Sequence, residues 1–265
     1  MKYNIIKLLS YVFSNRLAQN ILGLNILVAQ HLRGVGAGAG VLSSGEEKVV
    51  ETLVESTNSD STCIFDVGAN KGNFISLFKR RMEGNFEIHS FEPLSSSFDI
   101  LQSRYGTSKY VRINNCALGN SVGEENIFYD EKGSSLASMT KRDIAHDGKD
   151  MDKTEKVKVD TLDNYCSKKG IDRIDILKVD VEGHELDVFE GARGMFDDGR
   201  IKYVMFEFGG CNIDTRTFMK DYFKFFRSVG YKRINRITPS GYLFEVSEYN
   251  EEIEKFMTTN YLVEM

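Results

Sequence analysis

The sequence of 265 residues has only two prolines, four cysteines and no long hydrophobic run. Its cysteines (Cys63, Cys116, Cys166 and Cys211) lie far apart and form no CxxC pair, which argues against a structural zinc site and a disulfide scaffold. Unpaired thiols suit a reducing compartment, so we predict a cytoplasmic protein. A net charge of −5 offers no reason to expect nucleic-acid binding.

The first 40 residues contain apolar clusters at 5–13 and 21–28, but no run approaches the roughly 20 residues of a membrane span. Arg16 supplies little positive charge ahead of the second cluster, so this cluster is not favoured as the core of a signal peptide. We therefore predict a helical extension over 1–40 that ends in a flexible glycine and alanine linker, 34–40. The favoured interpretation is that this extension packs on the domain. The alternative is that residues 1–30 contact a membrane surface or another subunit in an oligomer.

Apolar runs alternate with helical periodicities from residue 44 onward, which predicts one α/β domain over 41–265. The arrangement expected is a Rossmann-like, mostly parallel sheet of seven strands, with helices on both faces and a C-terminal β-hairpin. The seven strands of this sheet are expected at 62–67, 86–91, 109–113, 174–180 and 203–208 and in the hairpin that joins 231–237 to 242–246, before a short closing helix near 250–257. Two further strands, 126–129 and 155–159, are expected between the third and the fourth of these.

The stretch from Ile64 to Phe74 reads as a strand, a tight loop and the start of a helix, which is how a Rossmann-type fold opens its cofactor site. Asp66 lies near the end of the strand, and Gly68 and Gly72 bracket the loop. Glycine has no Cβ, so the backbone there can approach a ligand closely. Two glycines are a weak signal by themselves, because many such loops contain them.

Glu92 strengthens this interpretation, because it lies 26 residues after Asp66 at the predicted end of the second strand. A carboxylate in that place can accept hydrogen bonds from both ribose hydroxyls of an adenosine-containing cofactor. The GxGxxG spacing of a pyrophosphate cradle is absent, and Asp66 suits an ammonium group better than a diphosphate. Asn70 offers polar contacts to an amino-acid moiety. These features favour S-adenosylmethionine over NAD, with a nicotinamide-dependent oxidoreductase as the alternative.

Four sequence blocks resemble the FkbM family of methyltransferases: 65–72 (FDVGANKG), 90–93 (SFEP), 115–119 (NCALG) and 177–192 (LKVDVEGHELDVFEGA). The resemblance implies S-adenosylmethionine as methyl donor and a hydroxyl acceptor on a sugar, glycan, glycolipid or polyketide. By motif position, the methionine part would be surrounded by Gly68, Ala69, Asn70 and Gly72, the ribose held by Glu92, and the adenine bordered by Asn115, Cys116 and Ala117. Asp66, Asn73 and Pro93 complete the set of cofactor-binding candidates.

The candidate catalytic residues are Asp180, Glu207 and His184. Asp180 and Glu207 end neighbouring predicted strands, so their side chains should converge at the carboxyl edge of the sheet. A hydroxyl is a weak nucleophile that needs a base or a metal ion, and Asp180 is the first candidate for the base. Mg²⁺ held by these carboxylates is an alternative that is not favoured. Glu185 and Asp187 are expected on a solvated helix surface.

The polar segment between strands 126–129 and 155–159 carries Ser134 and Ser135, the candidate substrate-binding residues. Its charged run at 141–156 is interpreted either as a cover over the acceptor or as a disordered surface loop. An aromatic group in the helix 214–229 is expected to pack in the core rather than form a substrate wall. A non-catalytic binding protein on the same fold remains the third functional alternative.

Overall fold

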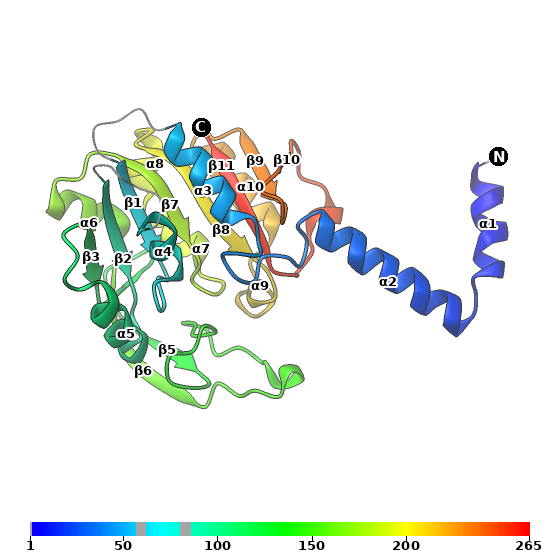
Figure 1. Cartoon of the computed structure of the whole chain (residues 1–265), viewed down its shortest axis with the longest axis horizontal. Helices are drawn as coiled ribbons and strands as arrows, with labels where there is room; N and C mark the ends of the chain where they lie inside the picture. The colour runs from blue at the N-terminus through cyan, green and yellow to red at the C-terminus, as the bar shows by residue number, and fades with distance from the viewer. Residues whose placement is uncertain (1, 57–61, 80–85) are drawn as a thin grey trace.

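The computed structural model of the chain describes residues 2–56, 62–79 and 86–265 (Figure 1). Its helices are α1 (Lys2–Val12), α2 (Arg16–Leu32), α3 (Glu46–Glu55), α4 (Asn73–Lys79), α5 (Ser95–Tyr105), α6 (Leu162–Lys169), α7 (Glu185–Glu190), α8 (Arg193–Asp197), α9 (Cys211–Thr215) and α10 (Met219–Ser228), with short 3₁₀ turns η1 (Ala145–Asp147) and η2 (Glu251–Ile253). Its strands are β1 (Thr62–Val67), β2 (Phe86–Phe91), β3 (Val111–Asn114), β4 (Ala117–Leu118), β5 (Gly123–Tyr129), β6 (Lys153–Asp160), β7 (Ile174–Val179), β8 (Ile201–Phe208), β9 (Arg233–Ile237), β10 (Leu243–Glu245) and β11 (Thr259–Glu264).

The main sheet has eight strands in the order β10-β9-β11-β8-β7-β1-β2-β3. The five strands from β8 to β3 are mutually parallel, whereas β11 runs antiparallel to both β8 and β9. The predicted Rossmann-like α/β fold with a mostly parallel sheet is therefore confirmed. Parallel order brings the carboxyl ends of β1, β2, β7 and β8 to one edge of the sheet.

The C-terminal part of the sheet differs from the prediction. The β9–β10 hairpin does form, and its turn is closed by a hydrogen bond from the Thr238 N–H to the Tyr242 carbonyl at 3.0 Å. It lies at the sheet edge, however, and the sheet continues with β11, which inserts between β8 and β9. Seven strands were therefore one too few. β11 was missed because its six residues form a strand only by pairing with β8 and β9, which lie far from it in the sequence.

Helices cover both faces of the sheet, because successive strand residues point to opposite sides. In β7, Leu177 and Val179 pack in a core with α6, α7, α8 and α10, whereas Ile176 packs with α3, α4 and α5 on the other face. The aromatic side chains of α10 belong to the first of these cores, which confirms that they are structural: Tyr222, Phe223, Phe225 and Phe226.

A three-stranded sheet with the order β4-β6-β5 forms a separate layer. Leu94, Ile127 and Val157 make a small apolar core beneath it. The segment joining β5 to β6 folds back on β5, where the backbone of Phe128 pairs with that of Ser138. The Ser138 side chain then contacts the backbone of Glu182, just beyond β7 of the main sheet. This layer therefore faces the carboxyl edge of the main sheet and supplies a second wall for a site there.

The N-terminal helices extend away from the rest of the chain (Figure 1). None of the residues of α2 is buried, so the expectation that the extension packs on the domain is wrong. The stretch 34–40, by contrast, is fixed to the domain rather than flexible: Val35 and Ala37 are buried, and the Gly38 N–H donates to the Thr258 carbonyl at 2.9 Å. Within the described residues, no helix is long and apolar enough to cross a membrane.

Candidate active site

Three strand ends meet at the loop that follows β1. The N–H groups of Gly68 and Ala69 both donate to the Phe91 carbonyl at the end of β2, at 3.0 Å. Gly68 has φ +84°, and a Cβ atom there would lie 1.8 Å from the Asp180 carbonyl oxygen that follows β7. The position thus requires glycine both for its left-handed backbone and for the close approach of the two loops. Asn70, at φ 46°, is a residue type that tolerates this conformation.

Glu92 is held rigidly just beyond β2. Its two carboxylate oxygens accept hydrogen bonds from the N–H groups of Asn70 and Leu94, each at 2.8 Å. The Asn115 side chain donates to the Glu92 and Pro93 carbonyls at 3.0 and 3.1 Å and so fixes the turn. Glu92 is 5% exposed, and no cation among the described residues pairs with it. Burial raises its pKa to about 7, against the opposing effect of the two N–H donors.

A cleft of about 560 Å³ opens between these loops and the β4-β6-β5 layer. Nine of the residues predicted from sequence line it, namely Asp180 from the catalytic set and eight on the cofactor and substrate side: Gly68, Asn70, Glu92, Pro93, Cys116, Ala117, Ser134 and Ser135. Asn70 also crosses the cleft, because its side-chain amide donates to the Ser134 carbonyl at 2.8 Å.

Several predicted cofactor residues lie outside the lining of the cleft. Gly72 faces the Tyr105 ring, where a Cβ atom would be 2.4 Å from Cε2, and Ala69 is buried in the core. Asn73 is exposed at the start of α4. Asp66 is 1% exposed inside β1, and its Oδ2 has no hydrogen-bond partner among the described residues. Burial raises the pKa of Asp66 to about 7, although the charge of Lys178 opposes this.

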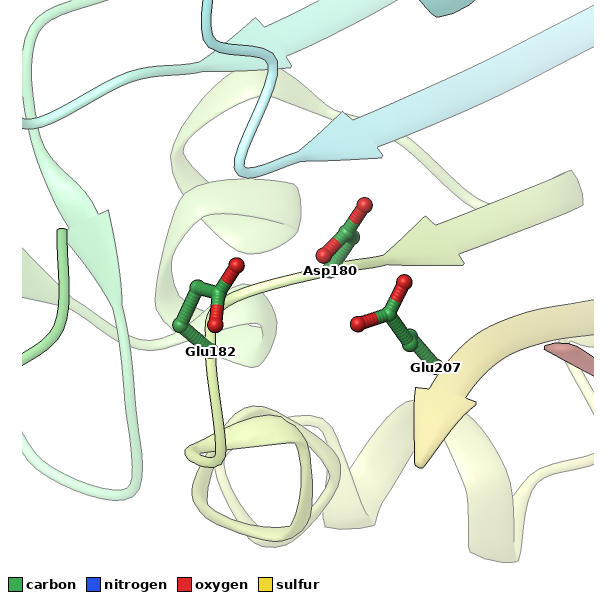
Figure 2. Close-up of side chains that lie close together, drawn as sticks. All are labelled: Asp180, Glu182 and Glu207. Atoms are coloured by element: carbon green, nitrogen blue, oxygen red, sulfur yellow. The ribbon is translucent and has the colours of Figure 1, made fainter. Parts of the chain in front are cut away.

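Asp180 and Glu182 line the cleft, and Glu207, which lies outside its lining, brings its carboxylate close to theirs (Figure 2). One oxygen from each lies within 4.8 Å of the others. Burial and the charge of Asp180 raise the pKa of Glu182 to about 8, against the charge of Arg142. Burial, with the charges of Asp180 and Glu182, also raises the pKa of Glu207 well above its ordinary value. Such a cluster can share a proton, and its oxygens are also ligands that a divalent cation accepts.

Glu182 and Arg142 are site residues that were absent from the predicted set. Glu182 has φ 55°, a strained conformation for a residue with a side chain, and it pairs with Arg142 of the β5–β6 segment. The Ser138 hydroxyl donates to the Glu182 carbonyl at 2.8 Å. This segment therefore lies against part of the site. That it covers an acceptor stays a prediction. Arg142 gave no local signal, because its partner lies 40 positions away in the chain.

His184 and Glu185 take structural places next to the site. Both His184 ring nitrogens are engaged, one with Asp187 at 2.7 Å and the other with the Thr140 hydroxyl at 3.0 Å, and His184 does not line the cleft. Glu185 is fully buried rather than solvated, so its expected position on a helix surface is wrong. Its Oε1 accepts hydrogen bonds from the N–H groups of Val181 and Gly183 and so fixes the loop that carries Glu182.

A family model described as the FkbM methyltransferase domain matches residues 66–233, which is more than half of the chain. The chain belongs to the FkbM methyltransferase family. The matched region begins in β1 and includes the cleft, the acidic cluster and the β4-β6-β5 layer. The extension formed by α1 and α2 lies outside it.

Two curated methyltransferases are similar to this FkbM family member. Methyltransferase sdnD of Sordaria araneosa is 30% identical over 155 residues, covering 49% of this chain and 60% of that protein. Methyltransferase 1 of Beauveria bassiana (strain ARSEF 2860) is 28% identical over 149 residues, covering 50% and 59%. The matches thus span about three fifths of the length of these relatives. A solved FkbM methyltransferase structure from Methylobacillus flagellatus KT aligns at 18% identity and a TM-score of 0.47, covering 77% of this chain and 44% of that one.

Proposed function

We propose that the protein transfers the methyl group of S-adenosylmethionine to a hydroxyl of a sugar, glycan or glycolipid. The observation that carries this proposal is the position of Glu92, a buried carboxylate without a cationic partner among the described residues, at one end of a cleft whose other end is acidic. Family membership supports the reaction class. The carboxylates of Asp180 and Glu182 in the lining of the cleft support the class of acceptor.

The residues at the Glu92 end fit the adenosine part of the cofactor. Each carboxylate oxygen of Glu92 already accepts one backbone N–H, which leaves lone pairs free for two ribose hydroxyls. Cys116 and Ala117 border the same end of the cleft, where the flat face of an adenine can lie. Gly68 and Asn70 continue the wall toward Asp180, as the methionine part requires.

The acidic end supplies what a hydroxyl acceptor needs. S-adenosylmethionine, when bound, presents an electrophilic methyl group on a sulfonium, and its neutral leaving group needs no acid. Asp180 lines the cleft and accepts a hydrogen bond from the acceptor hydroxyl, which orients it. The hydroxyl proton passes to the cluster of Asp180, Glu182 and Glu207, where the raised pKa of the two glutamates makes their ionised forms stronger bases.

A hydroxyl-rich acceptor matches the polar groups that line this part of the cleft. Ser135 of the β5–β6 segment is exposed and lines the cleft together with Asp180 and Glu182, whereas the hydroxyls of Ser134 and Ser138 are already bonded to Asp130 and to the Glu182 carbonyl. Serine hydroxyls both donate and accept, and carboxylates accept, so neighbouring hydroxyls of one sugar ring can each find a partner.

The test measures S-adenosylhomocysteine binding and radiolabelled methyl transfer to a panel of saccharides and glycolipids. Wild type is expected to bind S-adenosylhomocysteine. Glu92→Gln should weaken this binding about 10- to 100-fold, because the ribose hydroxyls lose a hydrogen bond to a charged carboxylate. Glu248→Gln, at an exposed position of the C-terminal segment, is the matched control and should bind like wild type. Stabilisation by NAD but not by S-adenosylhomocysteine would instead indicate an oxidoreductase. Cofactor binding without transfer to any panel member would favour the non-catalytic alternative.

A further inference from the structure

The charges of the chain are divided unevenly between the N-terminal segment and the rest. Residues 1–45 contain four Lys and Arg and no Asp or Glu. All 39 acidic residues and the other 30 basic ones lie in 46–265, so the first part carries a charge of +4 and the second −9. The N-terminal segment is thus complementary to a negatively charged surface, although the protein as a whole is acidic.

The same segment exposes large apolar side chains. Along α2, positions separated by three, four and seven residues fall on one face of the helix. The side chains on this face are between 51% and 72% exposed: Leu17, Ile21, Leu24, Val28 and Leu32. In α1, Ile5, Leu9 and Val12 are exposed in the same way. A continuous apolar stripe of this kind in water marks a surface that binds another apolar phase.

The length and polarity of α2 indicate that it lies along a membrane surface. Its 17 residues span about 25 Å, which is shorter than the hydrocarbon core of a bilayer. Asn20, Asn25 and Gln30 interrupt its apolar character. Leu22, Ile26 and Leu27 are exposed outside the stripe, and Arg16 at the helix start carries its positive charge. A helix that is too short to span a bilayer, and that exposes this much apolar surface within a basic segment, lies in the plane of the interface, with its apolar side chains inserted among the acyl chains.

A second copy of the chain fits the segment less well. Pairing two such helices would bring like charges together, and neither helix contains an acidic residue to form ion pairs across the seam. An anionic lipid surface supplies the missing negative charge and the apolar phase together.

The connection between α2 and the domain is fixed by close contacts, so binding of α2 to a membrane would also position the domain. The Arg33 carbonyl accepts a hydrogen bond from Nε of Arg236 at 2.7 Å. Gly34 lies so close to the Ile237 carbonyl that a Cβ atom would be 2.2 Å from its oxygen. The helix therefore leaves the domain from a fixed point at strand β9 (Figure 1).

We propose that α1 and α2 bind the surface of a bilayer containing anionic lipids and hold the domain beside it. The test is co-sedimentation of the full chain with phosphatidylcholine vesicles, with and without phosphatidylglycerol. Wild type is expected to sediment with the anionic vesicles, and less so as salt increases. The double substitution Leu24→Gln and Val28→Gln removes part of the stripe and should weaken binding at least about tenfold.

Val122→Gln is the matched control, because Val122 is 63% exposed on the body of the domain, away from these helices. It should bind vesicles like wild type, and thermal unfolding should show both variants folded. Equal binding to neutral and anionic vesicles would overturn the role of charge. Absence of vesicle binding, together with a wild-type dimer that the double substitution dissociates, would overturn the proposal and assign the stripe to a second copy of the chain.

Discussion

The ammonium nitrogen of Lys178 lies 2.9 Å from Oδ2 of Asp180, at the end of the central strand β7. Lys178 is 7% exposed, and its nitrogen is also 4.0 Å from Oε1 of Glu46. Burial alone disfavours the charged ammonium, but the carboxylates of Asp180, Glu46 and Asp66 outweigh it and raise the pKa of Lys178. The lysine is therefore charged, and it fixes the Asp180 carboxylate at the wall of the cleft.

Replacing this lysine with an isosteric apolar residue is expected to destabilise the fold strongly. Lys178→Met leaves Asp66, Glu46 and Asp180 close together without their shared cation. Breaking a buried ion pair on one side typically costs about 3–5 kcal/mol, so the free energy of unfolding should fall by about that amount. Urea unfolding followed by circular dichroism measures it.

Lys158→Met is the matched control, since Lys158 is exposed on β6 and the substitution should change stability by less than about 0.5 kcal/mol. Equal stability of the two variants would show that Lys178 does not compensate the three carboxylates.

Gly68 is expected to tolerate no side chain, for two separable reasons. Alanine there adds strain at φ +84° and also a clash with the Asp180 carbonyl oxygen. Gly230 has φ +88°, and a Cβ atom added there would meet nothing within 4 Å, so Gly230→Ala isolates the strain alone, about 1–2 kcal/mol. Gly68→Ala should lose clearly more stability and should also weaken S-adenosylhomocysteine binding, which calorimetry measures. Equal losses in the two variants would mean that the loops after β1 and β7 do not approach this closely.

The parts of the fold that could be predicted are those with local signals. β1, β2 and β7 are apolar runs that end at a turn, and the position of Glu92 follows from where β2 ends. The rule that ligands bind at the carboxyl edge of a parallel sheet then brings Glu92 and Asp180 to one cleft.

The features that escaped prediction depend on partners distant in the chain. β11 is a strand because β8 and β9 flank it, and Glu185 is buried because the loop above it offers two N–H donors. Arg142 reaches the site only through the fold of the β5–β6 segment. Lys178 did carry a usable signal, since a lysine inside a buried strand requires acidic neighbours. No residue pattern, however, could name Glu46 as one of them.

Glu92 should make the stability of the protein depend on pH. Its pKa is about 4.5 in the unfolded chain and about 7 in the fold, so the folded state holds the proton more tightly. This contribution is fully present below about pH 4.5 and is lost as the pH rises through about 7. The difference in pKa corresponds to about 3 kcal/mol. Glu92→Gln cannot titrate, so the stability of wild type relative to this variant should fall by about that amount between pH 4.5 and 8.

Urea unfolding of both proteins across this pH range provides the measurement, and Glu248→Gln serves as the control with an unchanged pH profile. A wild-type curve parallel to that of Glu92→Gln would show that the carboxyl is ionised in both states and that its burial does not raise its pKa.

Glu207 is expected to act in the transfer step and not in cofactor binding. Its carboxylate belongs to the acidic cluster, but the residue lies outside the lining around Glu92. Glu207→Gln removes one proton acceptor at little change in volume, so kcat should fall about 100-fold or more while the affinity for S-adenosylhomocysteine stays within about twofold. Because the pKa of Glu207 lies well above its ordinary value, the wild-type rate should continue to rise with pH beyond the range in which an ordinary carboxyl group titrates, and this rise should diminish in the variant.

Glu245→Gln, at an exposed position of β10, is the control and should keep the wild-type rate and pH profile.

Repeating the assays with a chelator and with added Mg²⁺ tells whether the cluster accepts the proton itself or binds a divalent cation. A rate that is unaffected by either reagent and falls in Glu207→Gln supports proton transfer to the carboxylates. A rate that a chelator abolishes and Mg²⁺ restores would instead assign Asp180, Glu182 and Glu207 to a cation, which would then lower the pKa of the acceptor hydroxyl directly. Unchanged turnover in Glu207→Gln under both conditions would remove Glu207 from the reaction.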